Sequence, residues 1–108
     1  MFDINEIEGK IKLKILENGI RVVEEANNKS VYLVNNKTDD KYKFTFNKYE
    51  DGSYRAIMSD DSSTVPDIER TINANGRISI FFCKSVISVY LKDDKIHMVA
   101  PEQFDIFE

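Results

Sequence analysis

The most apolar stretch of the chain spans residues 77–100, and two polar dipeptides, Lys84-Ser85 and Asp93-Asp94, divide it into three runs. Two residues is the commonest length of a β-hairpin loop, and the loop fixes which residues of the two strands lie opposite each other. The spacing therefore predicts a three-stranded antiparallel meander with a defined register. This register constrains the rest of the fold, because it decides which side chains share a face.

One face of the predicted meander is wholly apolar. Residues directly opposite each other share a face, and side chains alternate along each strand. In the predicted register Ile80 lies opposite Val89, and Leu91 lies opposite Ile96. The face consists of Ile78, Ile80, Phe82, Ile87, Val89, Leu91, Ile96 and Met98. A slip of one residue in either turn would mix the residues of the two faces. Because the predicted register keeps this face wholly apolar, we expect it to lie in the core.

The opposite face of the meander carries no Asp, Glu, Lys or Arg. It consists of Ser79, Phe81, Cys83, Val86, Ser88, Tyr90, His97 and Val99. A solvated sheet face normally alternates to charged residues, so this face is expected to be covered. Either a helix of the same chain covers it, or a partner protein or a second copy does, as a homodimer. In the second case Phe81, Tyr90 and His97 are the partner-binding residues.

Residues 10–26 fit two different structures. Lysines alternate with apolar residues over residues 10–15, which is the period of a strand, and Asn18-Gly19 favours a hairpin because both residues tolerate positive φ. The hairpin would place Ile15 opposite Val22. The alternative is a helix over residues 4–23 with two internal glycines, each costing up to about 1 kcal/mol. A short helix near residues 3–8 would precede the hairpin.

Three further strands are predicted, over residues 31–34, 41–49 and 53–58. The second of these segments alternates strongly between polar and aromatic residues, and Tyr42, Phe44 and Phe46 share one face of the predicted strand. The turn that joins the second strand to the third contains Asp51-Gly52. A tight turn there would place two basic residues opposite each other, so a bulged turn is an equal alternative.

A helix is predicted over residues 64–75. Thr64 can cap its first turn, Gly76 can end it, and Ile68 and Ile72 repeat at helical spacing. The predicted fold class is α+β and mostly antiparallel β, with two meanders joined by this helix. All 108 residues are expected to form a single domain.

Composition excludes several classes of protein. The single cysteine, Cys83, rules out a disulfide scaffold, and the net charge of -4 disfavours nucleic-acid binding. No segment resembles a signal peptide, and no apolar run approaches the ~20 residues of a membrane span. We therefore expect a cytoplasmic protein with no membrane association.

No catalytic, metal or cofactor motif is present. In the predicted register Cys83 and His97 are separated by several residues along the strands, too far apart for a nucleophile and its base. One cysteine and one histidine cannot dominate a zinc site, and the paired aspartates lack the spacing of a calcium loop. The sequence therefore predicts neither an enzyme nor a bound cofactor.

The C-terminal residues 101–108 fit two descriptions. Pro101 interrupts the strand pattern, so the residues after it are expected to form a separate extended tail. In the alternative, the apolar side chains of the sequence FDIF at residues 104–107 complete the core as a last strand.

The pentapeptide Gln103-Phe104-Asp105-Ile106-Phe107 resembles the short peptide by which bacterial replication and repair proteins dock on the DNA sliding clamp. That motif is usually written Gln-Leu-(Ser/Asp)-Leu-Phe, so Gln103, Asp105 and Phe107 match, and Phe104 and Ile106 replace leucines. The resemblance implies that Gln103 binds a polar subsite, and that Ile106 and Phe107 fill an apolar pocket of the clamp.

The sequence thus favours a non-enzymatic module that binds a protein partner. The contact surface would be the uncharged face of the meander or the C-terminal tail, which would dock on a sliding clamp. One alternative is a small inhibitor or immunity protein that presents acidic loops to a basic toxin or enzyme. A remote alternative is a hydrolase that uses loop carboxylates.

Overall fold

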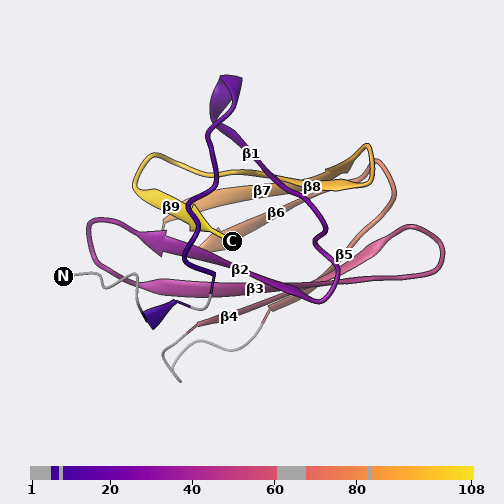
Figure 1. Ribbon diagram of the computed structural model, residues 1–108, viewed down its shortest axis with the longest axis horizontal. Coiled ribbons are helices and arrows are strands. Elements are labelled where there is room, and N and C mark those ends of the chain that lie inside the picture. The colour runs from indigo at the N-terminus through magenta and orange to yellow at the C-terminus, as the bar shows by residue number, and fades with distance from the viewer. Residues whose placement is uncertain (1–5, 8, 61–67, 83) are drawn as a thin grey trace.

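The computed structural model describes residues 6–7, 9–60, 68–82 and 84–108, which form two antiparallel sheets (Figure 1). The strands are β1 (Ile20–Val23), β2 (Lys29–Asn35), β3 (Lys41–Lys48), β4 (Tyr54–Asp60), β5 (Ile68–Ile72), β6 (Arg77–Phe82), β7 (Ser85–Lys92), β8 (Lys95–Val99) and β9 (Phe104–Phe107). One sheet has the order β5-β4-β3-β2-β9, and the other has the order β1-β8-β7-β6. The described residues contain no α-helix, and their helical structure is limited to short 3-10 turns such as η2 (Glu17–Gly19).

The two sheets pack face to face over one hydrophobic core. Strand β3 alternates between buried and half-buried residues, as its sequence predicts. Phe44 and Phe46 are fully buried, and their rings stack with centroids 6.2 Å apart. The four-stranded sheet contributes the predicted apolar face of the meander, whose buried members are Ile80, Ile87, Val89, Leu91, Ile96 and Met98. The prediction of a mostly antiparallel β domain is confirmed.

The register of the meander is confirmed at one turn and corrected at the other. Leu91 lies opposite Ile96, as predicted, and both loop aspartates have positive φ, as a two-residue hairpin requires. At the first turn Ile80 lies opposite Ile87 instead of Val89, because the loop begins one residue earlier than predicted. The resulting shift of two residues leaves Ile78, Ile80, Ile87 and Val89 together on the predicted apolar face.

The helix predicted over residues 64–75 is wrong. Residues 68–72 form strand β5, which pairs with β4 and places Ile68 opposite Met58 and Ile72 opposite Tyr54. Residues 61–67 lie outside the described part of the chain. Two isoleucines four residues apart fit one face of a helix and one face of a strand equally well, so the spacing was ambiguous. Pairing with β4 decides in favour of the strand.

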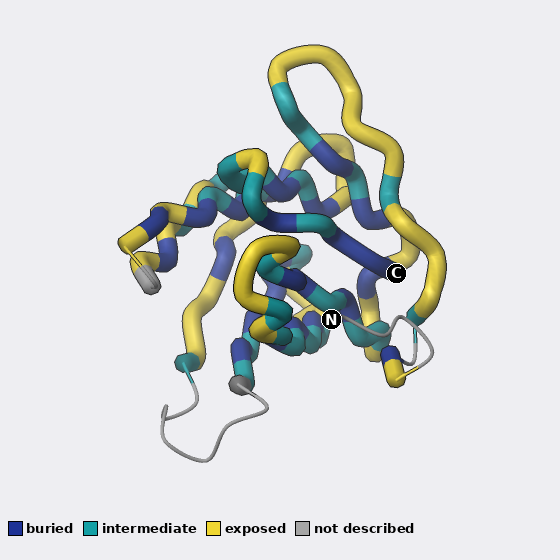
Figure 2. Tube along the Cα trace, turned by 90° about the vertical axis from the view of Figure 1, so that its left-hand side faces the viewer, coloured by how far each residue is buried: buried dark blue, intermediate teal, exposed yellow. Residues whose placement is uncertain are grey.

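Residues 10–26 form neither of the two predicted structures. The turn itself is present, because Asn18 and Gly19 have φ of 66° and 72°, and the Leu16 amide donates to the Ile20 carbonyl at 2.7 Å. The arm before it, however, leaves β1, and β1 pairs with β8. The predicted pairing of Ile15 with Val22 is therefore wrong, and the turn projects beyond the sheets (Figures 1 and 2). The short helix expected near residues 3–8 falls mostly outside the described residues.

The C-terminal segment is the last strand of the core and not a separate tail. β9 lies beside β2 in the sheet, and on its other side the Leu13 amide donates to the Ile106 carbonyl at 2.8 Å. Phe104 and Ile106 have no exposed surface. The N-terminal arm passes so close that a Cβ on Gly9 would lie 2.4 Å from the backbone carbon of Glu108. This close approach explains a glycine at that position.

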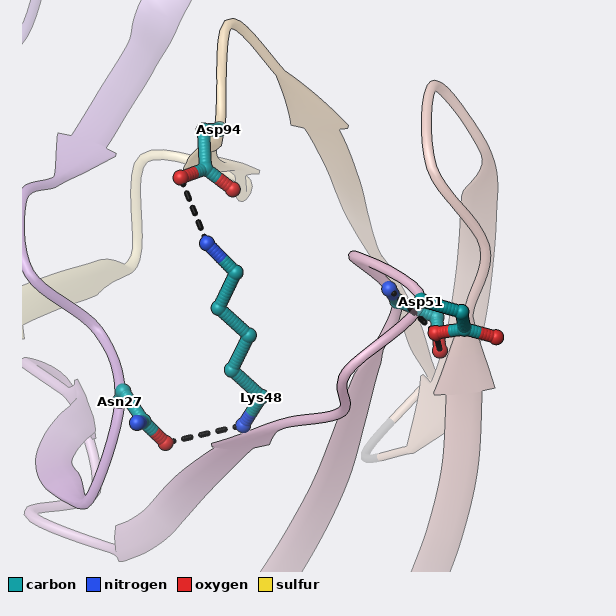
Figure 3. A network of polar contacts seen from close by, with 5 residues as sticks. Asn27, Lys48, Asp51 and Asp94 are labelled. Carbon is teal, nitrogen blue, oxygen red and sulfur yellow. Dashed lines mark hydrogen bonds and ion pairs between the residues drawn. The ribbon is translucent and has the colours of Figure 1, made fainter.

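A polar network joins the two sheets at one end of the molecule (Figure 3). The Lys48 ammonium donates to Asp94, in the turn between β7 and β8, at 2.7 Å, and this bond raises the pKa of Lys48. The Lys48 amide donates to the Asn27 side chain at 2.9 Å. In the neighbouring β3–β4 turn Gly52 has φ of 90°, which fits the bulged alternative. Asp51 accepts hydrogen bonds there from the Ser53 hydroxyl and amide, and they lower the pKa of Asp51.

Truncation of Phe104 should destabilise the protein strongly. We expect Phe104→Ala to lower the free energy of unfolding by about 3–5 kcal/mol, because it removes a fully buried ring. Phe81→Ala is the matched control, since Phe81 is 70% exposed, and its effect should stay within about 0.5 kcal/mol. Urea denaturation measures both. Equal effects of the two substitutions would contradict the placement of β9 in the core.

The carboxylate of Asp51 should contribute stability that depends on pH. A carboxylate whose pKa is lowered by folding stabilises the native state above the pKa of the unfolded chain, and this contribution is lost as the pH falls through the folded-state pKa. We therefore expect Asp51→Asn to lower the melting temperature near neutral pH, and the difference from wild type to shrink below about pH 4. A thermal-unfolding series across this range measures the effect. A difference that does not change with pH would contradict it.

Candidate partner-binding face

The outer face of the four-stranded sheet is the surface that turns away from the core. We define it by Ile20 and Val22 of β1, Arg77, Ser79 and Phe81 of β6, Val86, Ser88, Tyr90 and Lys92 of β7, and Lys95, His97 and Val99 of β8. The expectation that this face carries no charged residue is therefore wrong, because its strands extend to Arg77, Lys92 and Lys95. Phe81 is 70% exposed, and its cross-strand neighbour Val86 is 49% exposed. The described residues contain no α-helix, so the expectation that a helix of the same chain covers this face is wrong.

A row of stacked side chains crosses the outer face. The Arg77 guanidinium lies over the Tyr90 ring at 4.7 Å, and the Tyr90 ring stacks on the His97 ring with centroids 4.9 Å apart and planes 15° from parallel. The predicted pairing of Tyr90 with His97 is confirmed. Sequence reasoning missed Arg77, because the shifted register of the first turn brings it opposite Tyr90. Cation–π and ring stacking together hold these three side chains in fixed positions.

The orientation of His97 is fixed by a backbone contact. Its Nδ1 lies 3.1 Å from the Lys95 carbonyl oxygen, which can only accept a hydrogen bond, so Nδ1 is the donor. In the neutral ring Nε2 is then the acceptor. Cys83 lies outside the described residues, so its predicted separation from His97 stays a prediction.

An open groove of about 500 Å³ adjoins the outer face beside β1. Its apolar wall comes from Leu13, Leu16 and Val22, and His97 belongs both to the groove and to the outer face. Its charged lining residues are Lys14, Glu24, Asp93, Lys95 and Glu108. An apolar floor with a rim of both charge signs suits a side chain of a protein partner better than a strongly charged ligand.

The C-terminal residues proposed to contact a clamp do not lie on the outer face. The Gln103 side-chain amide donates to the Ser85 hydroxyl at 2.9 Å, and the Gln103 backbone carbonyl accepts from the Asn36 backbone amide at 2.7 Å. The side chains of Phe104, Ile106 and Phe107 are buried in the core clusters. Docking through this pentapeptide would require β9 to leave its sheet, at the cost of that burial.

Arg21 is an unusual buried residue that sequence reasoning missed. It points into the core from β1 and is 3% exposed, and its Nη2 donates to the Phe104 carbonyl at a long 3.4 Å. Its Nε and Nη1 are buried without a partner in the described part of the structure. Burial lowers the pKa of Arg21, and the charge of Asp105 opposes that effect. Strand alternation around Val22 was the signal that could have placed Arg21 inside.

Several surface lysines of the described residues form ion pairs with carboxylates. Lys12 lies 3.1 Å from Asp105, and Lys41 lies 2.9 Å from Glu6. Asp94 binds Lys48, as described above. In the described residues no group of three or more His, Cys, Asp or Glu side chains is placed to hold a metal ion.

Comparisons with known proteins returned no match: no family model, no curated protein and no solved structure is similar to this chain. Within the described residues, no helix has the length and apolar character needed to cross a membrane. The inference about function therefore rests on the geometry of the outer face.

Replacement of Arg21 by an apolar residue should stabilise the protein. A buried charge without full hydrogen bonding costs more in desolvation than it returns, so we expect Arg21→Met to raise the free energy of unfolding by about 1 kcal/mol or more. Arg55→Met is the control, because Arg55 is only half-buried and donates twice to Glu69, and it should bring no gain. Urea denaturation compares the two. A clear loss of stability in Arg21→Met would show that the guanidinium is well paired.

Proposed function

We propose that this protein is a non-enzymatic module that binds a protein partner over the outer face of the four-stranded sheet. One observation carries the proposal: Phe81 and Val86 lie side by side and exposed at one end of this sheet face, and its charged residues Arg77, Lys92 and Lys95 lie toward the other end. Large exposed apolar side chains that lie next to each other mark interaction surfaces in soluble proteins.

The composition of the face supports a protein partner. The cores of protein–protein interfaces are depleted in charged residues and enriched in Phe, Tyr and Arg. Here Phe81 is free to insert into a pocket, and Arg77 and Tyr90 are already stacked on each other. Side chains that are ordered before binding lose less conformational entropy on binding, so such a row suits an energetic hot spot.

The charge of the face indicates what the partner presents. The charged residues that these strands place on the face are all basic: Arg77 on the edge strand, and Lys92 and Lys95 beside the β7–β8 turn, where Lys95 pairs with Glu24. The partner that fits is an apolar protein surface with a carboxylate or a carbonyl oxygen within reach of Arg77. The proposal does not use the clamp-like pentapeptide, since its apolar side chains contribute to the core.

Substitution of Val86 tests the face. Val86 lies on β7 opposite Phe81, so Val86→Lys places a charge next to the exposed ring without touching the core. Tyr49→Lys is the control, because Tyr49 is 44% exposed in a loop of the other sheet. We expect Val86→Lys to weaken binding to a partner isolated with the wild-type protein by about tenfold or more, and Tyr49→Lys to leave it unchanged.

Calorimetry with the purified partner measures these affinities, and amide shifts on titration locate the contact. The expected shifts fall on β6, β7 and β8. Equal binding by the wild-type, Val86→Lys and Tyr49→Lys proteins would contradict the proposal.

A further inference from the structure

The backbone amides and carbonyls of β6 point alternately toward β7 and toward the open side of the strand. The Leu91 amide donates to the Gly76 carbonyl at 3.0 Å, and the register pairs the residues that follow one by one with β7. Antiparallel ladders alternate between hydrogen-bonded and non-hydrogen-bonded pairs, so Ile78 and Ile80 bond to β7. The amides and carbonyls of the residues between them, Ser79 among them, point to the open side of the strand. In the described residues no backbone hydrogen bond reaches that side.

The other strand edges are protected, and β6 is not. The edge strand β5 exposes Glu69 and Arg70, and charged residues on an edge discourage pairing with another chain. β9 is covered by the N-terminal arm, and β1 has only four residues. β6 has six residues in unbroken pairing with β7, without proline, lysine or a bulge, and its single charge is Arg77 at one end. An unprotected apolar edge of this kind is a template for strand addition.

We propose that β6 pairs antiparallel with β6 of a second copy of this chain, about a two-fold axis at Ser79. In this register Ser79 lies opposite Ser79 of the second copy, and Arg77 lies opposite its Phe81. The outward-pointing backbone groups of both strands then form about six hydrogen bonds between the chains. With the axis at Ser79, the outward-pointing backbone groups of Arg77, Ser79 and Phe81 are all paired in both copies. A shifted register would leave some of them unpaired.

The side chains of the edge are complementary to themselves in this pairing. On the outer face Phe81 of one copy packs beside Arg77 of the other, whose guanidinium already lies on Tyr90. On the inner face Ile78 lies opposite Ile80, so the apolar surface continues across the junction. No like charges oppose each other directly, because the two Arg77 side chains lie at opposite ends of the paired strands. Phe81 thus gains a neighbour across the junction and remains on the outer face of the joined sheet.

This inference goes beyond the proposed function, since it concerns the edge of the sheet and not its face. Pairing through β6 would join the outer faces of two copies into one continuous surface, so the dimer would present its partner with two adjoining contact areas. The contact is small, so the dissociation constant should lie on the order of 10–100 µM.

Sedimentation equilibrium over about 5–500 µM tests the pairing. We expect a reversible monomer–dimer equilibrium for the wild type. Ser79→Pro removes an outward-pointing amide that β7 does not use, so it should yield monomers, whereas Ser79→Ala keeps the amide and should dimerise. Phe81→Lys should also yield monomers. Circular dichroism and urea unfolding of each variant verify that the fold is retained.

Amide hydrogen exchange identifies the pairing at residue level. The Ser79 and Phe81 amides should be protected only at dimer-forming concentrations, whereas the Ile78 and Ile80 amides should be protected at all concentrations. A wild type that remains monomeric throughout the range would overturn the inference. So would a dimer that Val86→Lys dissociates and Ser79→Pro does not, because that dimer would use the face.

The proposed dimer through β6 and the proposed partner contact on the outer face can be disproved independently. A monomeric wild type that still binds its partner, with Val86→Lys defective, removes the second copy and keeps the proposed function. A dimer with protected Ser79 and Phe81 amides that binds no partner through Val86 removes the proposed function and keeps the pairing through β6.

Discussion

The structure depends on the burial of two sheet faces against each other. Successive side chains of a strand point to opposite faces, so each inward Ile or Val commits its neighbours to solvent. In the meander these neighbours are Ser, Val, Tyr and His, together with Phe81 and the basic residues Arg77, Lys92 and Lys95. A continuous apolar interior is thus achieved with an exterior whose charges, in these three strands, are all basic. The interior explains the stability of the sheet, but nothing in it requires the exposed ring of Phe81.

The local pattern of the sequence predicted which side chains share a face of the sheet better than it predicted which strands pair with each other. Strand period and two-residue turns were sufficient to assign the buried face of the meander, and the error of two residues at its first turn did not alter that face. The pairing of β1 with β8 and of β9 with β2 joins segments about 70 residues or more apart, and no local signal encodes such contacts. The inward position of Arg21 had a local signal, because strand alternation puts Arg21 on the same face as Val23, but that signal does not say which face of β1 is buried.

Short apolar patterns gave wrong predictions where the same spacing fits both a helix and a strand. Ile68 and Ile72 satisfy a helix and a strand equally, and only the hydrogen bonds offered by β4 separate the two. The C-terminal pentapeptide presents a related ambiguity, because alternating Phe104 and Ile106 suit both an extended peptide ligand and a buried strand. The structure places both side chains in the core. A motif of five residues therefore carries functional weight only when its side chains are accessible.

The exposed features of the four-stranded sheet meet at β6, and this coincidence favours a functional explanation. An edge strand with an open backbone and an adjacent exposed aromatic ring is a liability for aggregation, and natural edges normally carry a charge or a proline to prevent it. The neighbouring edge strand of the other sheet, β5, follows that rule with Glu69, which Arg55 neutralises in a two-point ion pair. Since the same chain protects one edge and leaves the other open, β6 is better explained by a partner strand than by tolerance of a defect.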